Sequence, residues 1–336
     1  MADLKKSILI KKAVLYFLVV LVAVIVLFLG ASDIAWGDVL GNIYRHIAHG
    51  EPLSSDGVII YEIRFPRIVL AIIVGGVLSG SGAIMQGIFK NPLVDPYLLG
   101  ISSGAAFGSA VSIGLFESWP IGILAFIGAM GASFLVIAIG RLAGGSSISL
   151  VLSGVVLSAF LSALSGSIKF FVDPQKAQAI VIWLLGSLSL ASWENVRIAL
   201  LGLVVGFVPL FLLRWRINIL GLGDSECMSL GVSPTKMRFI CISCISFACA
   251  LAVSVSGTIG WVGLVVPHLA RVIFGSDMRY LLGGSVALGA LILLGADTIA
   301  RSVSAYDIPV GIITALLGAP FFIFLLSKFA SKWGDR

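Results

Sequence analysis

Long apolar runs separated by short polar segments dominate the chain from near its first residue to near its last. A bilayer core about 30 Å thick is crossed by roughly 20 apolar residues in an α-helix. Ten runs approach this length, and the run at 262–274 is the shortest. The pattern therefore predicts an all-α polytopic membrane protein with about ten transmembrane helices in one bundle, a single domain over residues 1–336. The predicted spans are 13–30, 68–85, 98–115, 121–139, 150–170, 196–213, 239–257, 262–274, 281–300 and 310–326.

The polar segments between the spans predict the orientation of the chain. An even number of spans places both termini on the same side of the membrane. With the termini inside, the inner segments hold fifteen of the 22 lysines and arginines and the outer segments hold seven. An excess of basic residues marks the cytoplasmic side. Both termini are therefore predicted to be cytoplasmic.

Composition agrees with a lipid environment. The chain is 59% hydrophobic and only 11% charged, whereas a soluble domain carries about 25% charged residues. The net charge of +6 is spread over short segments between apolar runs, which indicates membrane topology rather than a nucleic-acid partner. Cys241 and Cys244 form a CxxC pair with no second pair to complete a zinc site. We expect buried thiols and no metal centre.

Several kinds of chemistry have no residues to support them in the sequence. There is no GxxxxGK[ST] phosphate loop and no HExxH, and only three histidines occur. Charged residues inside the predicted spans are few, chiefly Lys169 and the Asp297/Arg301 pair. An ion-coupled secondary transporter is the alternative interpretation, but it needs ionisable residues near the midplane. An intramembrane enzyme would need a paired nucleophile and base. We therefore expect a transport subunit with no enzymatic activity and no bound cofactor of its own.

Six motifs rich in glycine, proline and polar residues interrupt the apolar runs. They are RFPR (64–67), GAIMQGIFKNPLVDPYLLGISSGA (82–105), GLGDSECMSLGV (221–232), GTIGWVGLVVPHLAR (257–271), GADTIAR (295–301) and DIPVGIITALLGAP (307–320). In this order and spacing they resemble the FecCD or BtuC-like permeases of type II ABC importers, across essentially the whole chain. Two positions depart from the family pattern: Asp307 stands where glutamate is usual, and Cys227 where alanine is usual.

The resemblance implies a set of partners and a cargo. It implies a second copy of the permease, two ATP-binding cassette ATPase subunits that hold ATP and Mg, and an external substrate-binding protein, periplasmic or lipid-anchored. The complex would lie in the lipid bilayer of the cytoplasmic (inner) membrane of a prokaryote. The implied cargo is a metal chelate: an iron–siderophore complex or haem first, then cobalamin, with molybdate or tungstate last.

The resemblance also implies a docking surface on the outer face. Arg64, Arg67 and Arg301 match the arginines that family members offer to glutamates on the binding protein. Exposed guanidiniums pair with carboxylates in a bidentate manner and steer encounter. Two simpler interpretations remain open. The arginines can anchor helix ends at the headgroups, and Arg301 can pair with Asp297 one helical turn earlier.

On the inner face, the resemblance places the ATPase contact in the cytoplasmic loop at about 215–237. Asp224, Glu226, Leu230 and Gly231 are the candidates for this coupling contact. Without the resemblance, this loop with glycines and alternating polar residues would be a solvated turn.

A cytoplasmic gate is implied at two inner segments. Asn91, Pro92 and Leu93 follow the second span, where proline breaks the helix and its backbone groups need partners in protein or a water-filled cavity. Ser146 and Ser147 match a second gate element more loosely, and an ordinary polar turn explains them equally well.

The resemblance lines the translocation pathway with the fifth and tenth helices. Ser158, Ser162 and Ser165 of the fifth helix are the candidate lining residues, although serine also serves ordinary helix packing. His268 and Arg271 share one helical face near the inner side, and we interpret them as structural.

Glycines recur at every fourth position on two spans. Gly76 and Gly80 lie on the second span, and Gly100, Gly104 and Gly108 on the third. Small residues at this spacing let helix backbones approach closely in lipid. We interpret all five as packing positions.

Overall fold

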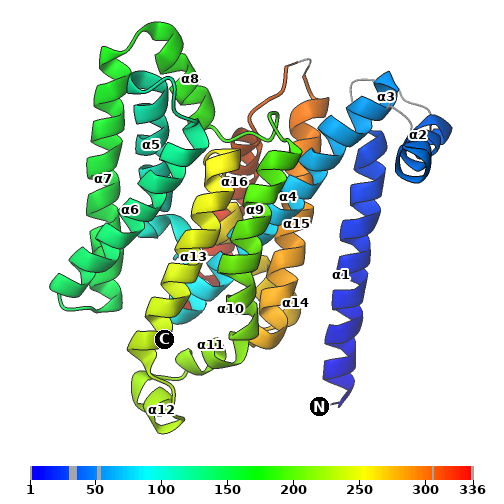
Figure 1. The fold of residues 1–336 in the computed structure, drawn as a ribbon. Coiled ribbons are helices and arrows are strands. Elements are labelled where there is room, and N and C mark those ends of the chain that lie inside the picture. Colours follow the sequence, from blue (N-terminus) through cyan, green and yellow to red (C-terminus); the bar gives the residue numbers. More distant parts are fainter. Residues whose placement is uncertain (1, 30–35, 51–53, 305, 334–336) are drawn as a thin grey trace.

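The computed structural model describes residues 2–29, 36–50, 54–304 and 306–333, and within them the regular structure is entirely helical (Figure 1). Among the described residues, seven helices are long and apolar enough to cross a membrane. They are Lys6–Phe28, Ser55–Ile88, Ile121–Leu142, Ser147–Phe171, Trp193–Leu212, Pro234–Ser256 and Met278–Ser302. Three shorter apolar helices are Ile101–Leu115, Val262–Phe274 and Val310–Leu325. Each of the predicted apolar runs is thus helical.

The helices carry the labels of Figure 1. In chain order they are α1 (Ala2–Phe28), α2 (Trp36–His49), α3 (Ser55–Val58), η1 (Ile59–Arg64), α4 (Phe65–Ile88), η2 (Pro96–Leu99), α5 (Ile101–Leu115), α6 (Ile121–Leu142), α7 (Ser147–Phe171), α8 (Pro174–Leu184), α9 (Trp193–Leu201), η3 (Gly202–Phe207), α10 (Val208–Leu212), α11 (Arg214–Leu220), α12 (Asp224–Ser229), α13 (Pro234–Ser256), α14 (Val262–Phe274), α15 (Met278–Ser302) and α16 (Val310–Trp333).

Several elements differ from the prediction. The amphipathic α2 and the short helices α8 and α11 were not predicted, because apolar run length detects only helices that can span a bilayer. Local capping explains α8, where Asp173 accepts a hydrogen bond from the Lys176 amide and Pro174 occupies the first turn. The predicted end of the first span at Gly30, and Arg336, lie outside the described residues.

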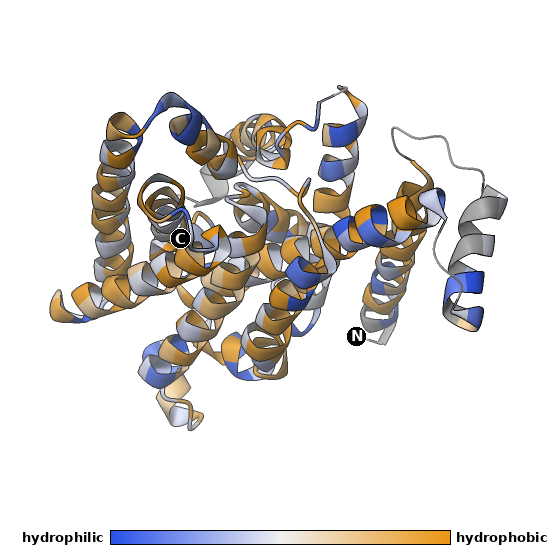
Figure 2. Ribbon diagram, turned by 45° about the horizontal axis from the view of Figure 1, so that its top comes forward, coloured by the Kyte–Doolittle hydropathy of each residue, from blue (hydrophilic) through white to orange (hydrophobic). Residues whose placement is uncertain are grey.

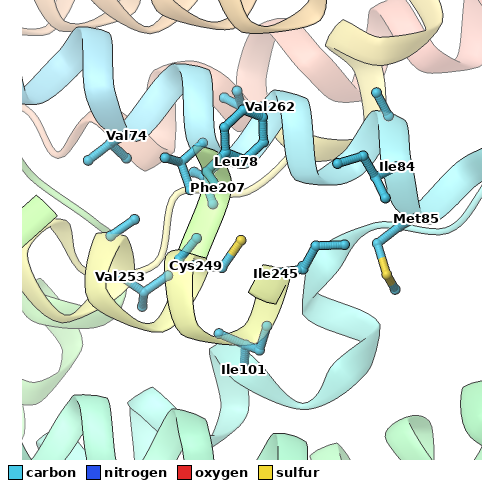
Figure 3. Close-up of a cluster of buried hydrophobic side chains, with 14 of the residues drawn as sticks. Val74, Leu78, Ile84, Met85, Ile101, Phe207, Ile245, Cys249, Val253 and Val262 are labelled. Carbon is cyan, nitrogen blue, oxygen red and sulfur yellow. The ribbon is translucent and has the colours of Figure 1, made fainter. Parts of the chain in front are cut away.

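The helix α4 forms the centre of the bundle. Of its most apolar stretch, 89% is buried, against 6% for α1. It packs against α13, α14 and α15. Figure 3 shows Val74 and Leu78 of α4 facing Cys249 and Val253 of α13 across the core. An α-helix buried in this way must be apolar all round, which explains why α4 is a continuous hydrophobic run.

Glycines let the central helices touch through their backbones. A Cβ added to Gly75 would lie 2.3 Å from the carbonyl oxygen of Gly289, and one added to Gly82 would lie 1.8 Å from that of Gly263. Both approaches join α4 to a neighbour, α15 or α14. Side chains larger than hydrogen cannot fit at these contacts.

The predicted packing role holds for most of the repeated glycines but is incomplete for one. Gly104 and Gly108 pack against the backbone of α6. A Cβ added to Gly104 would lie 2.3 Å from Gly128 O, and one added to Gly108 would lie 2.0 Å from Leu124 O. Gly100 instead has a left-handed φ of 76° at the start of α5. Glycine is favoured there by its conformation as well as by packing.

A second group of helices, α5 to α8, lies to one side of the central bundle (Figure 1). Many large apolar side chains on its outer surface are exposed, including Phe134 of α6 and Phe160 of α7. Figure 2 shows hydrophobic residues along the helices and hydrophilic ones concentrated at helix ends and connecting segments. This distribution suits helices surrounded by lipid or by partner helices.

Candidate functional site

The amino-terminal end of α4, which the sequence predicts to face outward, carries an ionic cluster, called the outer arginine cluster. It consists of Arg64, Arg67, Asp297, Arg301 and Asp307. Arg67 is its centre: Nε donates to both Asp297 oxygens at 3.0 Å, and Nη2 lies 2.9 Å from Asp297 Oδ1. Its Nη1 donates to Asp307 Oδ2 at 2.9 Å. Asp297 is 1% exposed, whereas the Asp307 side chain is 39% exposed. The cluster thus has one buried and one solvent-facing carboxylate.

The other two arginines of the cluster hold the end of α1. Arg64 Nη1 donates to Leu27 O at 3.0 Å. Arg301 donates to Leu29 O at 2.8 Å and to Val26 O at 2.9 Å. The last carbonyls of a helix lack partners within that helix and carry partial negative charge. Both guanidiniums therefore cap α1 and attach it to the central bundle.

These contacts correct the expectation that the outer arginines are exposed. Arg64 and Arg67 are only 5% and 8% exposed, because α1, α15 and the segment before α16 cover them. The alternative pairing of Arg301 with Asp297 is present at 4.0 Å, but it is longer than the Arg67–Asp297 pair. Docking of a binding protein to these residues stays a prediction.

The predicted coupling segment, residues 221–232, contains the short helix α12 and projects at one end of the bundle (Figure 1). Asp224 forms a bidentate pair with Arg238 of α13, at 2.6 and 3.0 Å. These hydrogen bonds hold the pKa of the Asp224 carboxyl below its usual value. Glu226 is exposed, and Gly231 has the left-handed φ of 75° that ends the segment.

The coupling segment also exposes three apolar side chains, two of which the sequence reasoning missed. The predicted contact residue Leu230 is 57% exposed. Leu222 and Met228, which were not predicted, are 61% and 64% exposed. An exposed apolar group at a projecting tip is typical of a protein contact. The signal in the sequence was the alternation of apolar with polar residues in this segment.

The predicted gate loop follows the inner end of α4. The helix α4 ends at Ile88, and Lys90 has a left-handed φ of 50°. Asn91 Oδ1 accepts a hydrogen bond from the Leu93 amide at 2.9 Å, and Leu93 is 48% exposed. Lys90 Nζ donates to Leu222 O at 3.1 Å. The structure therefore joins the gate loop directly to the coupling segment, which the sequence did not predict.

The second gate element is a helix start. Ser146 Oγ accepts a hydrogen bond from the Ser149 amide at 3.0 Å and thus caps α7. Ser147 is the first residue of that helix. Capping accounts for these serines locally, and their role in gating stays a prediction.

The serines of α7 line a cleft of about 360 Å³ between α7 and α5. Ser103 Oγ donates to Ser158 Oγ at 3.1 Å across this cleft. Ser162 is exposed and Ser165 is buried. The cleft is lined by Tyr97, Ser102, Ser103, Ala106, Ser158, Ser162, Ser165, Lys169, Leu184 and Thr258. These described lining residues include none from α16, the tenth apolar helix, which was expected to line the pathway together with α7.

The opposite face of α7 is apolar. Leu152, Val156 and Phe160 lie there and are 60%, 63% and 59% exposed. The predicted lining serines therefore face α5 within the same chain, and α7 presents a hydrophobic surface outward.

The polar residues of α14 have packing partners, as the sequence indicated. Arg271 Nη2 donates to Gln86 Oε1 at 3.0 Å, and Gln86 Nε2 donates to Leu264 O at 3.1 Å. This chain of hydrogen bonds joins α14 to α4. His268 is buried beside it, 7% exposed.

The fold and these sites define a class of protein. Long apolar helices form a bundle with a cleft lined by serines on one side. A projecting segment is joined to the end of the central helix. This arrangement is that of a polytopic membrane transport protein. The sequence matches the FecCD transport family over residues 18–328, and the chain belongs to this family.

Curated relatives of the chain are permease subunits. The chain is 58% identical to the "Probable iron chelatin transport system permease protein" of Helicobacter pylori over 312 residues, which are 92% of this chain and 95% of the relative. It is 41% identical to the hemin transport system permease protein HmuU of Yersinia pestis, over 80% of this chain and 82% of the relative.

The fold also matches solved structures. A "metal-chelate type ABC transporter" in "an inward-facing conformation" superposes with a TM-score of 0.83 at 33% identity, covering 94% of this chain and 98% of that one. PsaBC from Streptococcus pneumoniae superposes with a TM-score of 0.60 at 16% identity, covering 81% of this chain and 93% of that one, a likeness of fold alone.

Proposed function

We propose that this FecCD-family permease forms the translocation pathway of an ABC importer that carries an iron chelate or haem into the cell. The observation that carries the proposal is the 58% identity to an iron chelatin permease over 92% of the chain. The identity to HmuU supports haem as the other leading cargo. Molybdate comes last, since the relative named for it is 37% identical. The relative named for cobalamin is 41% identical, the same value as for HmuU, so sequence identity does not separate cobalamin from haem.

Membership of the family supports the assembly that we propose. Two copies of this single transmembrane domain associate with two ATPase subunits, which hold ATP and Mg, and with an external substrate-binding protein. The complex lies in the cytoplasmic membrane of a prokaryote. The exposed Glu226, Met228 and Leu230 of the coupling segment support an ATPase contact. Docking of the binding protein at Arg64, Arg67 and Arg301 is supported by the family relationship alone, because Arg67 is buried and already paired with Asp297 and Asp307.

The topology that we propose has ten spans and cytoplasmic termini. The three apolar helices of 10–17 described residues complete the seven long ones. The start of α1 and the coupling segment lie at the same end of the bundle (Figure 1). Basic residues are concentrated toward this end, which suits the cytoplasmic side.

Uptake into proteoliposomes tests the proposal. The permease would be reconstituted with its ATPase and binding protein, and the uptake of ⁵⁵Fe-labelled ferric chelates and of haem would be measured. We expect uptake that requires internal ATP and the loaded binding protein. Uptake that continues without ATP and depends on an imposed ion gradient would contradict the proposal and favour a secondary transporter.

A further inference from the structure

The polar cleft between α5 and α7 has one charged lining residue, Lys169. On α7 it follows Ser158, Ser162 and Ser165 at intervals of four, three and four residues, so all four lie on one face of the helix. Each of them lines the cleft. The sequence reasoning noted Lys169 only as a charged residue near the end of a span.

Most hydroxyl protons of the cleft are already used inside the protein. Tyr97 donates to Ile259 O at 2.8 Å, Ser165 donates to Leu161 O at 2.9 Å, and Thr258 donates to Leu184 O. Ser103 donates toward Gly100 O and Ser158 Oγ, each at 3.1 Å.

Three lining groups have no partner at all. Within the part of the chain that the structure describes, Ser102, Ser162 and Lys169 have no hydrogen bond or ion pair. An ammonium and two hydroxyls are therefore free to bind a ligand, and the Ser158 hydroxyl, which accepts from Ser103, keeps its proton as well.

The charge of Lys169 has no counterpart in the cleft. None of the described lining residues is acidic. Lys176, a lysine two turns further along the chain, lies instead in an ion-pair cluster with Glu117 and Asp173. A half-buried cation without a counter-ion in the protein is stabilised by an anion that enters the cleft. The missing partner points to a ligand that supplies the negative charge.

We propose that this cleft binds an anionic oxygen group on the periphery of the transported chelate, such as a carboxylate or a catecholate. The Lys169 ammonium supplies the opposite charge, and the Ser102 and Ser162 hydroxyls donate to the remaining oxygens. Charge-assisted hydrogen bonds of this kind are roughly twice as strong as neutral ones. The inference rests on the proposed function and narrows the cargo to anionic chelates, in preference to neutral or cationic ones.

A transport experiment compares two iron(III) probes, an anionic tris-catecholate and a neutral tris-hydroxamate, in the reconstituted complex. We expect Lys169→Met to lower ATP-driven uptake of the anionic probe roughly tenfold or more, since a charge-assisted bond is lost. Lys169→Arg should retain uptake, and Lys176→Met, the matched control, should leave it unchanged. Basal ATP hydrolysis of the Lys176→Met control should equal that of the unaltered complex.

Three transport results would each overturn the inference. In the first, the Lys169→Met variant carries the anionic probe at the rate of the unaltered protein. In the second, this variant loses uptake of both probes equally, and in the third, the unaltered complex carries only the neutral probe.

A second measurement does not depend on transport. Lysines of the purified complex are acetylated with and without each probe, and the modified sites are read by mass spectrometry. We expect the anionic probe to protect Lys169 while Lys176 stays as reactive as before, and the neutral probe to protect neither. Absence of this protection overturns the inference even if uptake is ATP-driven. Conversely, protection without any ATP-driven uptake would count against the proposed function alone.

Discussion

The two ends of the bundle each pair an arginine with an aspartate, in opposite surroundings. At the outer end, Arg67 and Asp297 have side chains 9% and 1% exposed. At the inner end, Arg238 and Asp224 have side chains 25% and 55% exposed. Removing one partner of a buried pair leaves an uncompensated charge and costs about 3–5 kcal/mol. An exposed pair contributes only about 0.2–1 kcal/mol. The outer pair therefore maintains the fold, whereas the inner pair positions a segment that stays free to contact a partner.

The largest predicted effect tests the outer pair. Asp297→Ala should destabilise the protein by about 3–5 kcal/mol, because Arg67 remains buried without its main counter-ion. Thermal unfolding of the purified permease in detergent measures this loss. Asp224→Ala is the matched control at the inner end and should change stability by less than about 1 kcal/mol. Equal effects of the two substitutions would remove the distinction between the two ends.

The second prediction separates docking from folding at the outer end. Reversing Arg64 and Arg67 to glutamate would place a carboxylate against Asp297 and disturb the fold, so it cannot report on docking alone. Asp307→Asn releases Arg67 Nη1 while the Asp297 pair stays intact. If the cluster receives glutamates of the binding protein, association should tighten by up to about tenfold at low salt. Titration of the reconstituted complex with binding protein measures the affinity of this association. An unchanged affinity would indicate that the cluster has a structural role only.

The third prediction concerns the link between gate loop and coupling segment. Lys90→Met removes the 3.1 Å hydrogen bond to Leu222 O. Loss of about 1 kcal/mol of contact energy should reduce transport per ATP hydrolysed by roughly fivefold. Lys236→Met, at an exposed lysine in the first turn of α13, serves as the control. If the Lys90→Met complex transports as much cargo per ATP hydrolysed as the unaltered complex, the contact has no part in coupling.

The smallest prediction is the pH dependence of the inner pair. The hydrogen bonds from Arg238 lower the pKa of Asp224 in the folded protein. The stabilisation is therefore complete above the unfolded pKa of about 3.9 and is lost as pH falls through the lower, folded value. Between pH 5 and 9, the difference in unfolding temperature between the unaltered protein and Asp224→Asn should stay constant. A difference that changes across this range would identify another titrating group.

Sequence reasoning located the apolar spans because lipid requires long runs of hydrophobic residues, and this constraint is local. The run at 262–274 coincides with α14. Burial of arginines could not be predicted in the same way. The motif RFPR predicts a helix that starts with charged residues. The position of Arg67 against Asp297, 230 residues away in the chain, depends on tertiary packing. The hydrogen bond that Lys90 donates to Leu222 O likewise joins segments that are distant in the chain. The serine face of α7 was predicted, but the helix that it faces was not.

The backbone contacts at glycine have a mechanical consequence. Because α4 meets α15 at Gly75 and Gly289, and α14 at Gly82 and Gly263, these helices cannot slide past one another without separating carbonyl groups from the atoms that press on them. The same holds for α5 and α6 at Gly104 and Gly128. Each set should therefore move as one rigid body. A pathway that opens and closes in alternation would then do so by displacing whole sets of helices rather than by bending any one of them.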